Sequence, residues 1–183
     1  QVSVAGDEVP AVNVVDETVA VVVDFVRGLV AALVVQARLA EVRGQSSPKS
    51  EQWKWFVDQY NQRRPQFLKE PETLLLVGQA AERYYKAQAR GEELSESLND
   101  VINDIYEGAL RADPNCWQAA LLEGRLFLSG YNERAAMPEL QRALKINPLA
   151  TEVLVTLGQA DLQGYKLASG RKRATTALEI NPH

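Results

Sequence analysis

The chain has 183 residues, 46% of them hydrophobic, which is enough for one substantial domain or two small ones with a buried core. Its 20 basic and 24 acidic residues give a net charge of −4, which offers no positive surface to nucleic acid or an anionic membrane. The single cysteine, Cys116, excludes an internal disulfide, so packing must hold the fold, and both reducing and oxidising compartments remain open.

The N-terminal residues predict two regions. Alternation of apolar and polar residues over 1–16 is interrupted by Gly6 and Pro10, so we expect an extended arm there. In the stretch that follows, apolar residues recur near helical spacing and favour a helix. The β-branched residues at Val19–Val23 also suit a buried strand. We expect residues 17–65 to form a helical N-terminal region.

The most apolar stretch, Thr18–Val35, is nearly long enough to cross a membrane. Asp24 and Arg27 lie inside it, and charged groups are costly in the middle of a membrane span. We therefore expect no membrane span and interpret the stretch as a buried helix.

Three segments in the middle of the chain have apolar residues at helical spacing, and each is predicted to form an amphipathic helix. They cover residues 51–64, 72–91 and 98–114. Acidic residues around the third helix are expected on its solvated face, as is usual for surface helices. These residues are Glu92, Glu93, Glu96, Asp100 and Asp104.

The C-terminal part of the chain contains a repeat of 34 residues. Pro114, Pro148 and Pro182 are 34 residues apart, and residues 114–149 match residues 148–183 at ten positions, against about two expected by chance. The longest shared segment is "ALKINP" against "ALEINP". Each proline is expected to end a helix, because it lacks an N–H and disfavours helical geometry in the residue before it.

These repeated residues resemble the tetratricopeptide-repeat (TPR) family, whose units are antiparallel helix pairs with small residues at the eighth, twentieth and twenty-seventh positions. With Trp117 and Thr151 as first positions, the small positions all carry Gly or Ala. They are Gly124, Ala136, Ala143, Gly158, Gly170 and Ala177. Such residues let two helices approach closely. The resemblance implies an all-α solenoid of antiparallel helix hairpins, with full repeats at 117–150 and 151–183.

A degenerate repeat is expected before the two full ones. The distance from Pro71 to Pro114 is 43 residues, nine more than the period, so this hairpin should be elongated. The TPR-like region then covers 71–183, with the degenerate repeat at 71–116. Three residues depart from the family pattern. Asp161 occupies an eleventh position that is usually large and apolar, and Tyr131 and Tyr165 follow glycines at the turns, so local packing there should differ.

No catalytic, cofactor or metal motif is visible. The only histidine is the last residue, His183, and no His/Cys cluster or glycine-rich phosphate loop is present. An enzyme that uses carboxylates alone is the one catalytic alternative. Cys116 is expected to be a buried thiol at a helix start. The basic run Arg171–Arg173 is expected on a solvated face. We predict a chain that is not an enzyme and has no cofactor.

The resemblance implies a protein-interaction scaffold, because stacked repeats bind peptides or helices in a groove lined by the first helix of each unit. The family's groove positions in the two full repeats fall on Gln118, Leu121, Arg125, Leu128, Ser129, Glu152, Val155, Gln159, Leu162 and Gln163. The degenerate repeat adds Glu82, Tyr85 and Lys86. The Lys and Asn with which some members clamp chaperone peptides are missing from these positions, so we do not expect that activity. The expected partner is a protein or peptide.

Two other functions are compatible with the same residues. The segments "YNERAAMPEL" and "ALKINP…ALEINPH" also resemble large bacterial TPR proteins. Some of those proteins carry a metallopeptidase-like domain that follows the repeats in the sequence. The chain would then be a non-catalytic accessory region from the N-terminal part of a larger protein. The third hypothesis is self-association, because the apolar residues Ala174, Ala177, Leu178 and Ile180 of the last helix are followed by no polar capping helix. We expect that face to be exposed.

Overall fold

The computed structural model describes residues 70–182 and scattered positions in the first third of the chain. Those positions are 24, 25, 27–29, 31, 32, 35, 52–55, 57, 58, 61 and 62, and all of them are helical. The predicted arm at 1–16 and the strand alternative at Val19–Val23 lie outside the described residues.

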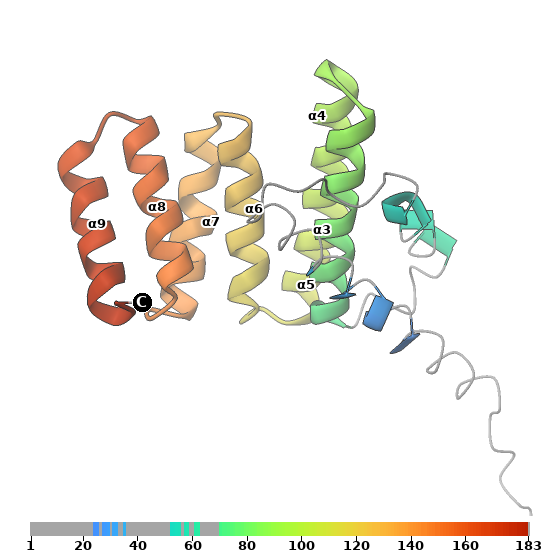
Figure 1. Ribbon diagram of the computed structural model, residues 1–183, viewed down its shortest axis with the longest axis horizontal. Helices are drawn as coiled ribbons and strands as arrows, with labels where there is room; N and C mark the ends of the chain where they lie inside the picture. Colours follow the sequence, from blue (N-terminus) through green and yellow to red (C-terminus); the bar gives the residue numbers. More distant parts are fainter. Residues whose placement is uncertain are drawn as a thin grey trace, which may run out of the picture.

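From residue 71 onward, three consecutive helix hairpins stack side by side (Figure 1). In the first, α3 (Pro71–Gln88) packs against a helical run made of α4 (Gly91–Asp100), the π-helix η1 (Val101–Tyr106) and α5 (Glu107–Ala112). The second pairs α6 (Trp117–Ser129) with α7 (Glu133–Ile146), and the third pairs α8 (Thr151–Gln163) with α9 (Leu167–Ile180). Contacts between α7 and α8 join the last two hairpins. The expected all-α solenoid is confirmed for the described part of the chain.

The second helix of each hairpin ends two residues before a proline, as the 34-residue spacing predicts. The residues that follow α5, α7 and α9 are Asp113, Asn147 and Asn181, and their ψ angles of 103°, 91° and 98° are non-helical. A following proline disfavours helical geometry in the residue before it. In the first two cases the side-chain oxygen also accepts a hydrogen bond from the backbone N–H two residues later, which fixes the turn.

Small residues lie where the helices of a hairpin cross. A Cβ atom placed on Gly124 would come within 2.6 Å of Cγ of Leu140, which is fully buried on α7. Helices α6 and α7 can therefore approach this closely only because no side chain intervenes. At Gly158 on α8 the nearest atom to such a Cβ would be the carbonyl oxygen of Gly170, at 3.5 Å. The two equivalent glycines thus have different amounts of free space.

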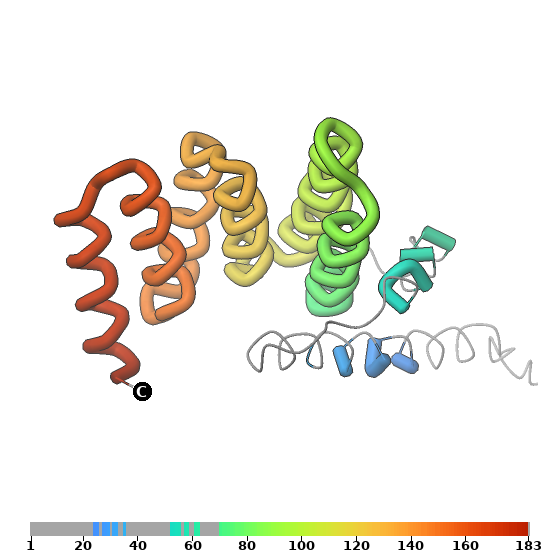
Figure 2. The backbone as a smooth tube through the Cα atoms, turned by 45° about the horizontal axis from the view of Figure 1, so that its top comes forward, coloured from blue at the N-terminus to red at the C-terminus, as the bar shows by residue number. Residues whose placement is uncertain are grey.

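The first hairpin is longer than the other two. Helix α3 has 18 residues, whereas α6 and α8 have 13 each. The turn between α3 and α4 consists of two residues and is followed by Gly91. Gly91 has φ of +61°, a conformation that glycine adopts without strain. The partner run continues helically from Gly91 to Ala112. The extra residues therefore lengthen the helices, and the end where α3 meets α4 projects beyond the turns of the later hairpins (Figures 1 and 2).

Residues of the N-terminal region contact this first hairpin. Trp53 is buried in the same core cluster as residues of α3, and the guanidinium carbon of Arg83 lies 5.8 Å from the centroid of its ring. Arg27, one of the charges inside the apolar stretch, forms an ion pair with Glu70 just before α3. None of the helices described in this structure has both the length and the apolar character needed to cross a membrane.

Asp161 shows how a carboxylate is accommodated at a position that is usually apolar. Its side chain is buried and accepts hydrogen bonds from Ser169 Oγ and Arg173 Nε, both at 2.6 Å. Burial disfavours the charged form, but these hydrogen bonds and the charges of Arg173 and Lys166 outweigh it and hold the pKa of Asp161 below its usual value. The prediction of a fully solvated Arg171–Arg173 run is therefore wrong for Arg173, which packs over Asp161.

The two tyrosines at the turns adopt the same unusual backbone conformation. Tyr131 and Tyr165 both have φ of +57°, in the left-handed region that favours glycine, and both side chains are exposed. Each follows a glycine whose own φ is negative. The departure from the family pattern noted in the sequence thus places a strained non-glycine residue at equivalent points of two repeats.

Candidate functional site

A hollow of about 500 Å³ lies between α6 and α8, and we call it the α6–α8 groove. These two helices contact each other only slightly, because both pack mainly on α7 or on their own partner helix. The groove is lined by Arg125, Leu128, Ser129, Thr156, Gln159, Leu162 and Gln163. Because lining residues of α6 recur three and four positions apart, they form one face of that helix.

A short hydrogen-bond chain holds the charged group of the groove. Arg125 Nε on α6 donates to Thr156 Oγ1 on α8 at 3.1 Å, and Thr156 Oγ1 donates to the carbonyl oxygen of Glu152 at 2.7 Å. Thr156 is itself buried. The guanidinium is therefore tethered across the groove and not left to move freely, which lowers the entropy lost when it binds a ligand.

The remaining lining groups combine apolar and amide surface. Leu162 is 52% exposed, which leaves much of a large apolar side chain in water. Gln159 and Gln163 are exposed beside it, and each amide can both donate and accept hydrogen bonds. A tethered guanidinium, an open leucine and two amides suit an extended peptide, whose backbone needs both kinds of hydrogen bond and whose side chains are mixed.

Six of the thirteen residues predicted for the groove line it, among them Arg125, Leu128, Gln159 and Leu162. Ser129 and Gln163, which the same reasoning placed there, line it too. Thr156 was missed, because the family pattern assigns no groove role to its position. Its β-hydroxyl, opposite a basic residue of the previous repeat, was the available signal.

Other predicted residues on these helices lie outside the groove. Gln118, Glu152 and Val155 are exposed towards the N-terminal ends of α6 and α8. Leu121 is only 2% exposed and belongs to the core, so it offers little surface to a partner.

The residues predicted in the degenerate repeat form a separate group on α3. Glu82 and Lys86 make an ion pair at 2.6 Å. Tyr85 is half-buried against Tyr84, and burial, followed by the charge of Asp100, raises its pKa. Lys86 lines a second hollow, beside the end of the long hairpin, and the α6–α8 groove does not include it.

Two further sequence predictions concern single features. Cys116 is buried at the start of α6, and burial raises the pKa of its thiol, which argues against a reactive cysteine. Across the described residues, no group of three or more His, Cys, Asp or Glu side chains is placed to hold a metal ion.

The last helix exposes apolar side chains, although not all those predicted. Leu167 and Leu178 are 67% and 63% exposed, and Ala174 and Ile180 are exposed as well. Ala177 was expected on this face, but it is buried. It occupies a small-residue position, and α9 packs against α8 there, so that prediction is wrong.

Comparisons with known proteins add information on the fold. No protein-family model and no curated protein matches the chain. Among solved structures 19 chains match, including one titled "MamA RS-1 ArsTM double mutant". That structure is 19% identical, with a TM-score of 0.52 over 84% of this chain and 76% of its own. MamA is a TPR protein, and at this level of identity the match shows the fold alone. The helix pairs described above thus have the TPR arrangement.

Proposed function

We propose, starting from this TPR fold, that the protein is an interaction scaffold that binds a peptide or helical segment of a partner in the α6–α8 groove. The observation that carries the proposal is the tethered Arg125 beside the exposed Leu162. Both line a hollow between the first helices of two successive repeats. The same groove would serve either a free-standing scaffold or a non-catalytic accessory region of a larger protein.

The size and chemistry of the groove support this function. A hollow of about 500 Å³ falls within the range of roughly 300–1,000 Å³ found for ligand sites. Arginine is a frequent interface anchor, and its planar group can pair with a carboxylate through two hydrogen bonds. Because the anchor is already oriented by Thr156, less of the binding energy is lost in ordering it.

The test uses peptides selected from a random 12-residue display library on the full chain, with affinities measured by fluorescence anisotropy. Arg125→Ala and Leu162→Ala should each weaken binding at least about fivefold, which corresponds to the 1 kcal/mol that marks a significant interface residue. Arg134→Ala is the matched control, because Arg134 is exposed on α7 and away from the groove.

The outcome is clear in either direction. If no peptide is enriched, or if the groove variants bind selected peptides as tightly as the Arg134→Ala control, the groove is not the binding site. Urea unfolding of each variant separates loss of binding from loss of fold.

Self-association through α9 is a second candidate, favoured by the exposure of Leu167 and Leu178. Exposed apolar surface often marks an interaction site, and the exposed Ala174 and Ile180 lie on the same helix as these two leucines. In sedimentation experiments Leu178→Glu should shift the chain towards monomer, while Glu179→Gln, next to it on the same exposed helix end, should not. An unchanged sedimentation profile for Leu178→Glu would exclude this face as the contact.

A further inference from the structure

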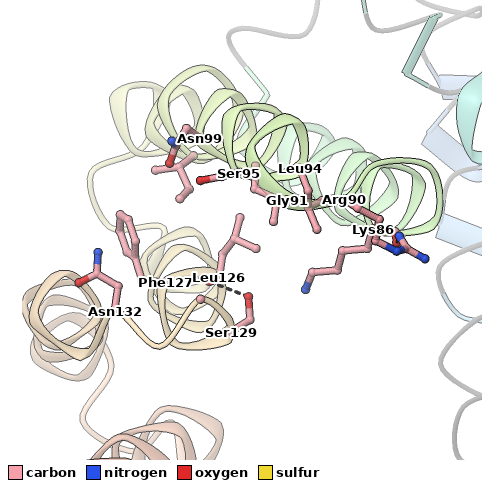
Figure 3. A pocket seen from close by; sticks show the side chains of 13 residues that line it. Lys86, Arg90, Gly91, Leu94, Ser95, Asn99, Leu126, Phe127, Ser129 and Asn132 are labelled. Carbon is pink, nitrogen blue, oxygen red and sulfur yellow. Dashed lines mark hydrogen bonds between the residues drawn. The ribbon is translucent and has the colours of Figure 1, made fainter.

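The projecting end of the first hairpin creates a second hollow of about 650 Å³, which we call the overhang cleft. It lies between the α3–α4 end and the turn that joins α6 to α7 (Figure 3). A hairpin of the ordinary repeat length would end level with its neighbours, so the cleft exists because this hairpin is longer. Of the groove positions that the family pattern gives, only Lys86 and Ser129 line it, and the other described lining residues lie outside that pattern.

The cleft has an apolar floor. Its apolar lining residues come from both sides, namely Leu94, Leu98 and Ile102 from the long hairpin and Leu126 and Phe127 from α6. Ile102 and Leu126 are buried, whereas Leu94, Leu98 and Phe127 are only partly covered. Covering them further would remove apolar surface from water, which is worth roughly 25 cal/mol per Å².

The charged groups that line the cleft are all positive. Lys86 lies in the last turn of α3 and Arg90 in the turn that follows it, and no Asp or Glu among the described residues lines the cleft. The acidic residues of α4 are exposed on its other faces, as for Glu92 and Glu93. In a chain with a net charge of −4, this local excess of positive charge selects for acidic ligands.

The present partners of these two cations leave room for a ligand. Lys86 pairs with Glu82 at 2.6 Å, but both groups are partly exposed, and such pairs are worth between 0 and about 1 kcal/mol. Arg90 donates through Nη1 to the carbonyl oxygens of Lys86 and Ala89, which keeps its guanidinium at the end of α3 with its positive charge not neutralised.

The overhang cleft adjoins the α6–α8 groove. Ser129, the last residue of α6, lines both hollows. In the part of the chain that the structure describes, the groove contributes one further cation, Arg125, and no acidic lining residue. A peptide that extended from the groove past Ser129 into the cleft would meet three positive side chains, and no negative one among the described lining residues.

We propose that the overhang cleft takes an apolar side chain from a peptide whose neighbouring residues are acidic, as a subsite continuous with the α6–α8 groove. The inference rests on the proposed function and specifies its ligand. An amphipathic acidic segment satisfies both observations together: its apolar residue covers the floor, and its carboxylates pair with Lys86, Arg90 and Arg125. A basic segment would meet like charges, and a neutral one would leave the cations unused.

The experiment uses the same random 12-residue display library on the full chain. Selected peptides should be enriched in Asp and Glu flanking a Leu, Ile or Phe. Three variants are then compared for the best peptide: the double change Lys86→Gln with Arg90→Gln, the single change Ser95→Phe, which fills the cleft from an exposed position, and the control Arg134→Gln.

The double variant should bind at least about fivefold more weakly and with less salt dependence, because two ionic contacts are removed. Ser95→Phe should weaken binding by a similar factor without changing the salt dependence, because it blocks the floor and leaves the cations. The control should bind as the original chain does. Urea unfolding checks that each variant is folded, and having two independent variants keeps the test valid if one of them is not.

The results separate this inference from the function on which it rests. Selected peptides that lack acidic residues, or that bind the double variant and Ser95→Phe as well as the original chain while Arg125→Ala weakens them, would overturn the cleft subsite and leave the groove intact. Failure to enrich any peptide would overturn both.

Discussion

Gly124 and Gly158 occupy the same position of two successive repeats, yet replacing each by alanine should change stability in opposite directions. At Gly124 the new Cβ would lie 2.6 Å from Cγ and Cδ2 of Leu140 and 3.4 Å from the carbonyl oxygen of Ala136. Because Leu140 is fully buried, it has no free space to move into. At Gly158 the nearest atoms are at 3.5 and 3.8 Å, which are ordinary van der Waals distances.

The magnitudes follow from two opposing effects. Replacing glycine by alanine inside a helix gains about 1 kcal/mol, because the unfolded chain loses conformational freedom. Overpacking a core typically costs about 1–3 kcal/mol. We therefore expect Gly124→Ala to lower the free energy of unfolding by about 1–2 kcal/mol and Gly158→Ala to raise it by about 0.5–1 kcal/mol. For a chain of this size, each kcal/mol corresponds to a shift of about 2–4 °C in Tm.

The assay is urea and thermal unfolding of the two variants beside the original chain. A further pair isolates the cause: in the Leu140→Ala background, Gly124→Ala should become neutral or stabilising, because the clashing atoms are gone. The reasoning would be refuted if both glycine variants shifted the transition in the same direction, or if the Leu140→Ala background failed to relieve the defect.

Three other predictions follow from the described residues. Asp161→Asn should cost about 1–3 kcal/mol by weakening the charged hydrogen bonds with Arg173. Because the folded-state pKa is lowered, this stabilisation should be present above the ordinary aspartate pKa of about 3.9 and lost as the pH falls through the lowered value, as urea midpoints against pH will show. Burial, followed by the charge of Glu139, raises the pKa of Glu123 to about 8, so stability should fall as the pH rises from the ordinary value towards 8, and Glu123→Gln should flatten that profile. Tyr131→Gly and Tyr165→Gly should each raise the free energy of unfolding by up to about 1 kcal/mol, because glycine adopts a positive φ without strain; lower melting temperatures would show that the tyrosines make stabilising contacts.

The sequence predicted those parts of the fold that depend on local rules. Helix ends before Pro114, Pro148 and Pro182 follow from proline chemistry, and small residues mark the close crossings, whatever the rest of the chain does. The groove positions followed from the resemblance, because side-chain direction in a repeat is set by its register.

What the sequence could not predict depends on contacts between elements. The length of the insertion before Pro114 was readable, but whether it formed a loop or longer helices depends on packing against α6, so the overhang cleft was not foreseen. The partner of Asp161 was equally hidden, because Arg173 lies on the next helix within a run of basic residues that resembles a solvated face. Thr156 acquires its role only because Arg125 lies opposite it in the previous repeat.

The two buried carboxylates of the full repeats, Glu123 and Asp161, are stabilised in two different ways. Glu123 and Leu157 occupy equivalent positions and both are buried. The helix packing therefore buries this position whether the residue is charged or apolar. Glu123 has Glu139 nearby, and the position equivalent to Glu139 in the next repeat is Arg173, the partner of Asp161. Where the second helix supplies a cation, the buried acid stays ionised and its pKa falls. Where it supplies another acid, the buried group can lower its energy only by keeping its proton, and its pKa rises.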